Sequence, residues 1–392
     1  MRPHYDVVIV GGAVIGSAAA YFLRADTGFG GSVLVLERDF GYTECATTRS
    51  AASIRHQFSI AQNVRMSMAG TRFLRQAHEH LAVDGDGPAI GFHEAGYLFL
   101  ARGAGRAVLL RNHAVQRAEG ADVALLDRPA LAQRFPWLAV EDLAAGSLGL
   151  SGEGWLDAHA LMHGFRRKAI ATGAEYREAT VAGLEREGDR VMRVRLTDGT
   201  RIACGTVINA AGTGATALAA TAGIALPVES RKRCVFHFRT PAKLPDCPLV
   251  IDPSGLYFRP EGAGFICGVA PAEADDSPCT DFEVPHAWWD DVLWPALAAR
   301  VPGFEAARMI SAWAGHYDVN TLDHNVILGA HPEVSNLLFA NGFSGHGLQQ
   351  APAVGRAIAE LVIVGGFRTL DLSAFGWQRV LEGTPMLELN VV

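Results

Sequence analysis

The stretch Tyr5-Asp6-Val7-Val8-Ile9-Val10-Gly11-Gly12-Ala13-Val14-Ile15-Gly16 decides the fold of this chain of 392 residues. Its apolar half predicts a short β-strand, which enters a glycine turn and is followed at once by an alanine-rich helical segment, 17–24. A second apolar run, 33–36, ends at the acid Glu37. This order of strand, glycine turn, helix, strand and acid is typical of the βαβ unit that holds an ADP moiety.

The positions of this motif have distinct physical roles. Gly11 makes the tight turn, Gly16 lets helix and strand pack closely, and free N–H groups at the helix start can bind the phosphates. Glu37 can accept hydrogen bonds from the adenosine ribose, which argues against a 2′-phosphate. Ala13 stands where the second glycine is usual, so its methyl group narrows the approach of the phosphates. The residues expected to contact the nucleotide here are Gly11, Ala13, Val14, Ile15, Gly16, Glu37 and Arg38.

Length and composition favour a globular protein of two domains. The chain is longer than one ordinary domain, and 49% hydrophobic with 19% charged residues is typical of a well-packed soluble protein. A net charge of −7 gives no attraction to nucleic acid or anionic membranes. No apolar run approaches the roughly 20 residues of a membrane span. The first strand begins within a few residues of Met1, so we expect no targeting peptide.

Cysteine and histidine spacing predicts no metal site. The six cysteines are scattered without C-x-x-C spacing, and none of the 14 histidines forms a clear ligand pair beside carboxylates. We therefore expect reduced thiols in a cytoplasmic protein.

Two further glycine motifs lie far along the chain. The buried strand 206–212 ends in the small residues Ala210-Ala211-Gly212, which leave space for a bulky group, such as a ligand, to approach the backbone. The run Asn341-Gly342-Phe343-Ser344-Gly345-His346-Gly347 lies between a predicted strand, 337–340, and a predicted helix, 351–364. Its backbone N–H groups can point at one ligand, and a helix N-terminus favours negative charge. With a flavin, this loop would stabilise the anionic pyrimidine side of the reduced ring.

Periodicity predicts further elements between these motifs. Buried strands are expected at 96–100 and 191–196, and the stretch 228–268 is β-rich. Helices are expected over 61–81, 106–119 and 157–172, with a short one capped at 127–129.

Together with Tyr257 and the run Trp313-Ala314-Gly315-His316-Tyr317, these motifs resemble the D-amino-acid oxidase and sarcosine oxidase superfamily of FAD enzymes, over essentially the whole chain. The resemblance implies an α/β fold, α+β overall. An FAD-binding Rossmann-like βαβ domain would comprise residues 1–82, 146–222 and 320–392. An inserted β-rich substrate domain would comprise 83–145 and 223–319, with the flavin ring at the seam.

The superfamily also implies roles for individual residues toward FAD. Thr48, Arg49 and Ser50 would lie along the flavin and its ribityl–phosphate arm, and Val181 would meet the adenine through its backbone. The other residues implied in the cofactor site are Ala211, Gly212, Gly315, Gly342, Phe343, Ser344, Gly345, His346, Gly347, Leu348 and Gln349.

On the substrate side, the resemblance implies a carboxylate anchor and two tyrosines. Arg55, in an Ile-Arg-His context, matches the arginine that binds the substrate carboxylate in sarcosine-oxidase-like members. A planar guanidinium suits this task because it pairs with both oxygens. Tyr257 matches an active-site tyrosine, and Tyr317 stands where D-amino-acid oxidases carry an arginine. The expected catalytic residues are Arg55, Tyr257, Tyr317 and His316.

Three departures from the sarcosine oxidase pattern limit the chemistry. Gly315 replaces the cysteine that attaches the flavin, so FAD is expected to be noncovalent. Ile266 stands where a lysine near the flavin speeds the reaction with oxygen, so oxygen reactivity should fall. Gln349 replaces a second carboxylate-binding lysine. These departures favour a dehydrogenase or a slow oxidase.

The resulting expectation is an FAD-dependent oxidoreductase that takes a hydride from the C–N bond of a small amino acid or N-alkyl amino acid and gives an imine. Oxygen or a quinone would accept the electrons, and the protein would be a monomer or a homodimer. Two alternatives stay open: a flavin-bearing assembly or scaffold protein, and a 2-hydroxy-acid dehydrogenase. The second alternative needs a base beside the hydroxyl, for which His56 or His316 could serve.

Overall fold

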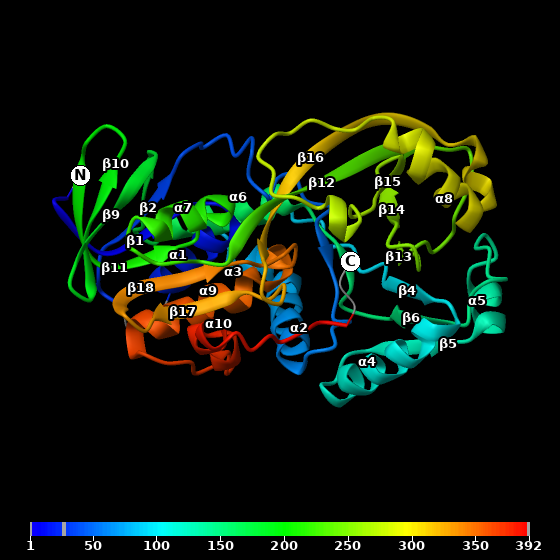
Figure 1. The fold of residues 1–392 in the computed structure, drawn as a ribbon, viewed down its shortest axis with the longest axis horizontal. Coiled ribbons are helices and arrows are strands. Elements are labelled where there is room, and N and C mark those ends of the chain that lie inside the picture. The colour runs from blue at the N-terminus through cyan, green and yellow to red at the C-terminus, as the bar shows by residue number, and fades with distance from the viewer. Residues whose placement is uncertain (1, 26–28, 390–392) are drawn as a thin grey trace.

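The computed structural model describes residues 2–25 and 29–389, which form two lobes side by side (Figure 1). One lobe contains a mainly parallel sheet and most of the long helices. The other contains a second, largely antiparallel sheet. Strands β12 (Val228–Arg239) and β16 (Arg308–Asn320) pair along their length and join the two lobes. This mixed α/β architecture confirms the predicted fold class.

The first sheet forms the nucleotide lobe. Because β1 pairs in parallel with both β2 and β11, the opening motif lies at its centre. In spatial order its strands are β17 (Ile327–His331), β18 (Val334–Asn341), β11 (Arg201–Asn209), β1 (His4–Val10), β2 (Val33–Glu37) and β8 (Glu175–Glu178). The hairpin of β9 (Val181–Glu187) and β10 (Arg190–Leu196) pairs with β11.

Helices cover this sheet because its central strands are apolar on both faces. On β1, Val7 and Ile9 belong to one core cluster, whereas Val8 and Val10 belong to another. Small residues let α1 and α9 approach closely: a side chain at Gly355 would collide with Ala18. The helices of this lobe are α1 (Val14–Ala25), α2 (Ala61–Arg75), α3 (Ala77–His80), α6 (Ala158–Ala171), α7 (Ala215–Ala220), α9 (Gly347–Val364) and α10 (Trp377–Glu382).

The second sheet forms the other lobe, and its strands come from two separate parts of the chain. In spatial order they are β16, β12, β15 (Gly264–Gly268), β14 (Tyr257–Glu261), β13 (Leu249–Ile251), β4 (Tyr97–Ala101), β6 (Ala145–Gly149) and β5 (Val123–Leu126). The helices around it are α4 (Arg106–Ala118), α5 (Arg128–Arg134) and α8 (Trp294–Arg300). Strands β3 (Ser53–Ile54) and β7 (Gly154–Trp155) pair antiparallel and form a separate small sheet.

The structure corrects two expected helix boundaries. Strand β6, which contains the expected domain boundary at residue 146, pairs with β4 and β5 in the second sheet. The helix expected over 61–81 is broken at Gln76, whose backbone leaves the helical conformation. Helix α9 begins at Gly347, not at residue 351, because the glycine run itself turns into the helix.

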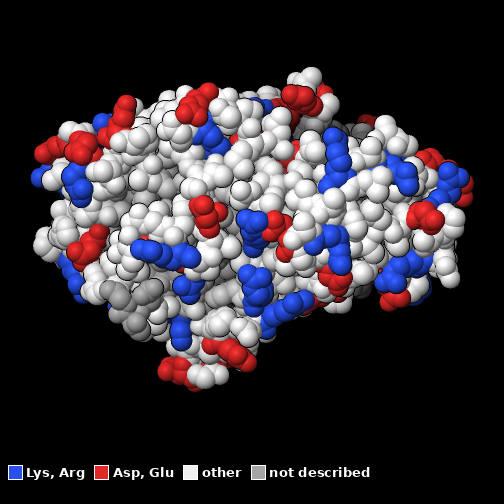
Figure 2. Space-filling model, turned by 90° about the horizontal axis from the view of Figure 1, so that it is seen from below, with Lys and Arg blue, Asp and Glu red and all other residues white. Residues whose placement is uncertain are grey.

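The surface was compared with two features, a membrane-spanning helix and a region of one charge sign. No helix in the described ranges is long and apolar enough to cross a membrane. Basic and acidic residues lie close together over the face shown in Figure 2, with several basic residues near its middle.

Candidate active site

The turn between β1 and α1 has the geometry that the opening motif predicts. Gly11 has φ +99°, a conformation that favours glycine, and a side chain there would collide with the carbonyl of Ala210. A side chain at Gly16 would collide with the carbonyl oxygen of Gly11. Both glycines are therefore required by close backbone approach, as the sequence predicts.

A cavity of about 400 Å³ runs from this turn to the N-terminus of α9. It passes the hairpin at Val181 and the end of β11 at Ala211, so it joins all three glycine motifs. The predicted cofactor residues that line it are Gly11, Ala13, Val14, Ile15, Glu37, Arg38, Ser50, Val181, Ala211, Gly212, Phe343, Gly345, Gly347 and Leu348.

Glu37 lines this cavity and also braces the glycine turn. One carboxylate oxygen accepts the N–H of Gly12 at 2.8 Å, and the other accepts the N–H of Asp39 at 3.1 Å. The side chain is thus fixed at the end of β2, where the ribose of an ADP moiety is expected.

The segment 47–50 lies across the seam between the lobes. Arg49 donates to the carbonyl oxygens of Thr43 and Ala314, both at 2.7 Å, and Trp313 Nε1 donates to the Arg49 carbonyl at 2.9 Å. A side chain at Gly315 would press on Arg49, so this close contact requires a small residue on β16. The Thr48 hydroxyl donates to the carbonyl of Tyr42 at 2.7 Å, and Thr48 lines neither cavity.

The loop before α9 differs in one respect from the expectation. The N–H groups of Gly342 and Phe343 donate to a carboxylate oxygen of Asp318, at 2.8 and 3.3 Å. These two donors are therefore occupied within the protein, and Gly342 lines neither cavity. Gly345 and Gly347 line the large cavity, so the part of the loop that faces it is 343–348.

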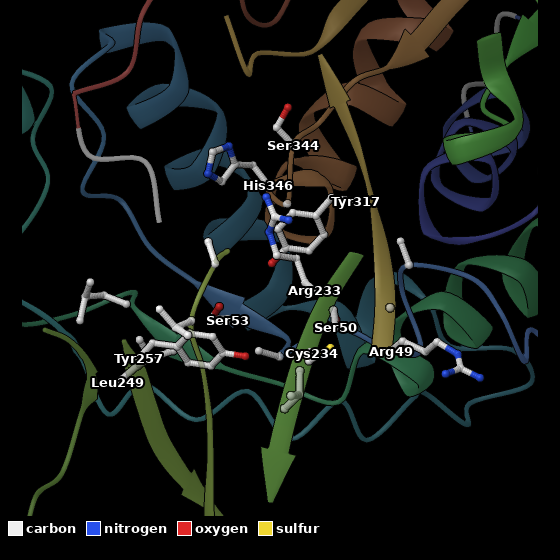
Figure 3. Close-up of a pocket in the computed structure, with 18 of the residues that line it drawn as sticks. Arg49, Ser50, Ser53, Arg233, Cys234, Leu249, Tyr257, Tyr317, Ser344 and His346 are labelled. Carbon is white, nitrogen blue, oxygen red and sulfur yellow. The ribbon is translucent and has the colours of Figure 1, made fainter. Parts of the chain in front are cut away.

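A second, smaller cavity of about 80 Å³ adjoins the first at the seam. The two cavities share Ala46, Ser50, His316, Tyr317 and Gly345. Figure 3 shows Tyr257 and Leu249 on one side of this space, with the Tyr257 hydroxyl pointing into it. Ser344 and His346 lie on another side, and the Arg49 guanidinium points away. Of the described residues that line it, three are arginines and none is Asp or Glu.

Arg55 reaches this cavity from the segment that follows β3. It is only 3% exposed, and its side chain is paired with His346 Nε2 at 2.9 Å. Its guanidinium lies over the Phe58 ring at 4.6 Å, and its own N–H donates to Gln349 Oε1 at 2.8 Å. Because arginine only donates, His346 must accept through Nε2. Burial first, and then the charge of Arg55, hold the pKa of His346 well below its usual value, so this imidazole is neutral.

Tyr257 and Tyr317 both line the small cavity, and burial raises the pKa of each phenol, so both keep their protons. His316 lines both cavities and packs edge-on against Phe282 at 4.4 Å. His56 lies elsewhere: it lines neither cavity, and its Nε2 lies 2.8 Å from the Thr71 hydroxyl. Burial lowers the pKa of His56 to about 4.

The structure adds site residues that sequence reasoning did not select. Arg233 lines the small cavity, lies over the Tyr317 ring at 5.4 Å and pairs with Asp276 through both terminal nitrogens, at 2.7 and 2.8 Å. Cys234 lies beside it, and Cys45 lines the large cavity. Asp318 was missed although it directly follows Tyr317, because its position opposite Gly342 depends on how β16 crosses the seam.

Comparison with known proteins gives the class of this fold and site. The chain belongs to the FAD dependent oxidoreductase family, whose model matches residues 6–361. The FAD-dependent oxidoreductase domain-containing protein 1 of Xenopus laevis is 42% identical over 422 residues, 99% of this chain and 85% of that protein. The crystal structure of L-proline dehydrogenase from P. horikoshii superposes with a TM-score of 0.87 and 26% identity, over 98% of this chain and 100% of that one. Glycine oxidase from Geobacillus kaustophilus gives a TM-score of 0.81 at 26% identity, over 96% and 99%.

These findings confirm the predicted superfamily, FAD as the cofactor and an oxidoreductase as the class of enzyme. The residues present fit FAD. The close approach at Gly11 and Gly16 leaves the start of α1 open to the large cavity, as a pyrophosphate requires. The seam shared by the two cavities is the place where a flavin ring would meet a substrate.

Proposed function

We propose that the protein oxidises the C–N bond of a small amino acid or N-alkyl amino acid, with a product imine that water hydrolyses. The observation that carries this proposal is the small cavity at the seam, lined by Arg55 and by no described Asp or Glu. Such a site suits a compact anionic substrate. The relatives named for glycine oxidation and L-proline dehydrogenation support the same substrate class.

In this proposal, Arg55 binds the substrate carboxylate and His346 holds its guanidinium in place. The neutral His346 accepts a hydrogen bond from Arg55 and so helps to orient this guanidinium, and Arg55 lines the small cavity. Tyr257 and Tyr317 would confine the amine end between the two lobes. Bound FAD supplies the acceptor for the hydride. The substrate enters with its nitrogen deprotonated, so no carboxylate base is required beside it.

The electron acceptor would be a quinone or, more slowly, oxygen. A positive charge beside the ring stabilises forming superoxide. Of the three arginines that line the small cavity, Arg233 is neutralised by Asp276, the Arg49 guanidinium is held by the carbonyls of Thr43 and Ala314, and Arg55 would be paired with the substrate carboxylate. This arrangement supports the dehydrogenase or slow-oxidase reading.

One observation favours a second candidate, oxidation of a 2-hydroxy acid. His316 lies where the two cavities meet, and burial lowers the pKa of its imidazole, so it is neutral and could take a hydroxyl proton. His56 lines neither cavity and so could not serve as this base.

The test is anaerobic mixing of the purified holoprotein with a panel of amino acids, N-methyl amino acids and 2-hydroxy acids, followed by the loss of flavin absorbance. Bleaching by amino acids or N-alkyl amino acids supports the proposal. Bleaching only by hydroxy acids would replace it with the second candidate. A holoprotein that no compound reduces, although dithionite does, would favour an assembly or scaffold role.

A further inference from the structure

We propose that Asp318 is a positioning residue for bound FAD, which fixes the 342–347 loop and holds a carboxylate at the wall of the large cavity. Its negative charge there would disfavour the additional negative charge of the reduced flavin and so lower the reduction potential. The proposal concerns the cofactor alone and does not depend on which substrate is oxidised.

Hydrogen bonds join Asp318 and its neighbour Asn320 to the 342–347 loop. Its carboxylate accepts the N–H groups of Gly342 and Phe343. Its own carbonyl accepts the N–H of Ser344 at 3.0 Å. Two residues on, the N–H of Asn320 donates to the Ser344 hydroxyl at 3.1 Å. Since Asp318 belongs to β16 and the loop precedes α9, these bonds lock the strand that joins the lobes onto the flavin end of the cavity.

The charge of Asp318 is isolated. Its side chain is 8% exposed and lines the large cavity, and it takes part in no ion pair among the described residues. The other described acids on the wall of this cavity, Glu37 and Glu44, belong to its ADP end. Glu44 pairs with Arg38 at 3.3 Å, so its charge is compensated. Asp318 is therefore the acid placed to act on the ring end.

An unpaired carboxylate in a buried site interacts strongly with other charges because little water screens it. Burial raises the pKa of Asp318 to about 6, so the group is ionised at pH 8. Replacing its charge while keeping its shape should make reduction of the flavin easier. An asparagine at this position still offers a side-chain oxygen to the N–H groups of Gly342 and Phe343. The loop should therefore keep its conformation in Asp318→Asn.

The experiment compares the holoproteins of the wild type, Asp318→Asn, Asp318→Ala and the matched charge control Glu44→Gln at pH 8. Dithionite titration against a reference dye gives the midpoint potential, and titration of each apoprotein with FAD gives Kd. We expect Asp318→Asn to shift the oxidised–reduced equilibrium at least tenfold toward reduced flavin, about 30 mV for this two-electron couple. Its FAD Kd should stay within about threefold of the wild type.

Asp318→Ala should also weaken FAD binding by about tenfold, since it leaves two buried N–H groups without an acceptor. Glu44→Gln should leave the potential unchanged. An Asp318→Asn potential equal to that of the wild type, or an equal shift in Glu44→Gln, overturns the proposal. If Asp318→Asn yields no folded holoprotein, Asp318→Glu replaces it and should keep the wild-type potential. A shifted potential in that variant, which retains the charge, would count against the proposal.

Discussion

The guanidinium of Arg55 is joined to Nε2 of His346 across 2.9 Å, although the two residues are 291 positions apart in the chain. Arg55 follows the short strand β3, and His346 occupies the N-cap position of α9. The pair therefore connects the segment that would hold the substrate with the loop that would hold the flavin. Because the imidazole is neutral, it orients the arginine without neutralising its charge.

Arg55→Met should weaken substrate binding far more than FAD binding. Loss of a buried charge-assisted pair costs about 2–5 kcal/mol. That cost corresponds to an increase of about thirtyfold or more in substrate Kd. The measurement is the substrate dependence of flavin reduction in anaerobic stopped flow, with FAD Kd measured beside it.

Arg259→Met is the matched control for this variant. Arg259 is also a buried guanidinium at the seam, but it donates to the carbonyl of Ala51 and lines neither cavity. Its loss should lower stability and leave the substrate dependence nearly unchanged. If both variants show the same change in substrate dependence, or if Arg55→Met shows none, Arg55 is not the anchor.

The flavin should be released by acid. Gly315 offers no side-chain nucleophile to the seam, so we expect acid precipitation to transfer all the yellow colour to the supernatant. Colour kept in the pellet would show a covalent link. Mass spectrometry of the variants Cys234→Ser and Cys45→Ser would then identify its site, since these thiols line the two cavities.

The local geometry of the opening motif could be predicted because its residues lie close together in the sequence. Gly11, Gly16 and Glu37 act within one βαβ unit, and each has the contacts that its position in the motif predicts. The positions of Arg233 and Asp318 depend instead on the register between β12 and β16, strands that begin 80 residues apart. The partners of β6, which contains the expected domain boundary at residue 146, are likewise set by long-range pairing. Local patterns in a single sequence do not show which distant strands pair.

The buried acid Glu153 contacts the residues that follow Arg55, and it should make the free energy of unfolding depend on pH. Glu153 is fully buried, accepts the N–H of His56 at 2.6 Å and accepts Gln57 Nε2 at 2.8 Å. Burial raises the pKa of Glu153 from 4.5 to about 7. In the unfolded chain the group ionises near pH 4.5, so the folded state loses stability as pH rises from there to about 7.

Glu153→Gln removes this titration. The free energy of unfolding of the variant, relative to the wild type, should therefore rise by on the order of 3 kcal/mol between pH 4.5 and pH 8. Urea denaturation at several pH values measures this difference. A difference that stays constant with pH would mean that Glu153 does not titrate in this range.

Reduced flavin in this protein should react slowly with oxygen. Ile266 stands where sarcosine-oxidase-like members place a lysine, and it is 1% exposed on β15. Ile266 lies directly opposite Arg259 on the neighbouring strand β14, so the two side chains share one face of the sheet. Arg259 is two residues from Tyr257 on that strand, so the Tyr257 side chain lies on the same face. At Tyr257 that face forms one wall of the small cavity, whereas Ile266 and Arg259 themselves do not line it. The wild-type protein, reduced anaerobically and mixed with aerated buffer containing a quinone, should pass its electrons mainly to the quinone.

Ile266→Lys should raise the rate of reoxidation by oxygen, because it adds a positive charge on the cavity face. The new ammonium would be buried beside Arg259, which is unfavourable for folding. Ile266→Met is therefore the control for packing, and thermal unfolding with and without FAD shows whether each variant is folded. Fast oxygen reoxidation of the wild type, unchanged in Ile266→Met, would overturn the dehydrogenase reading.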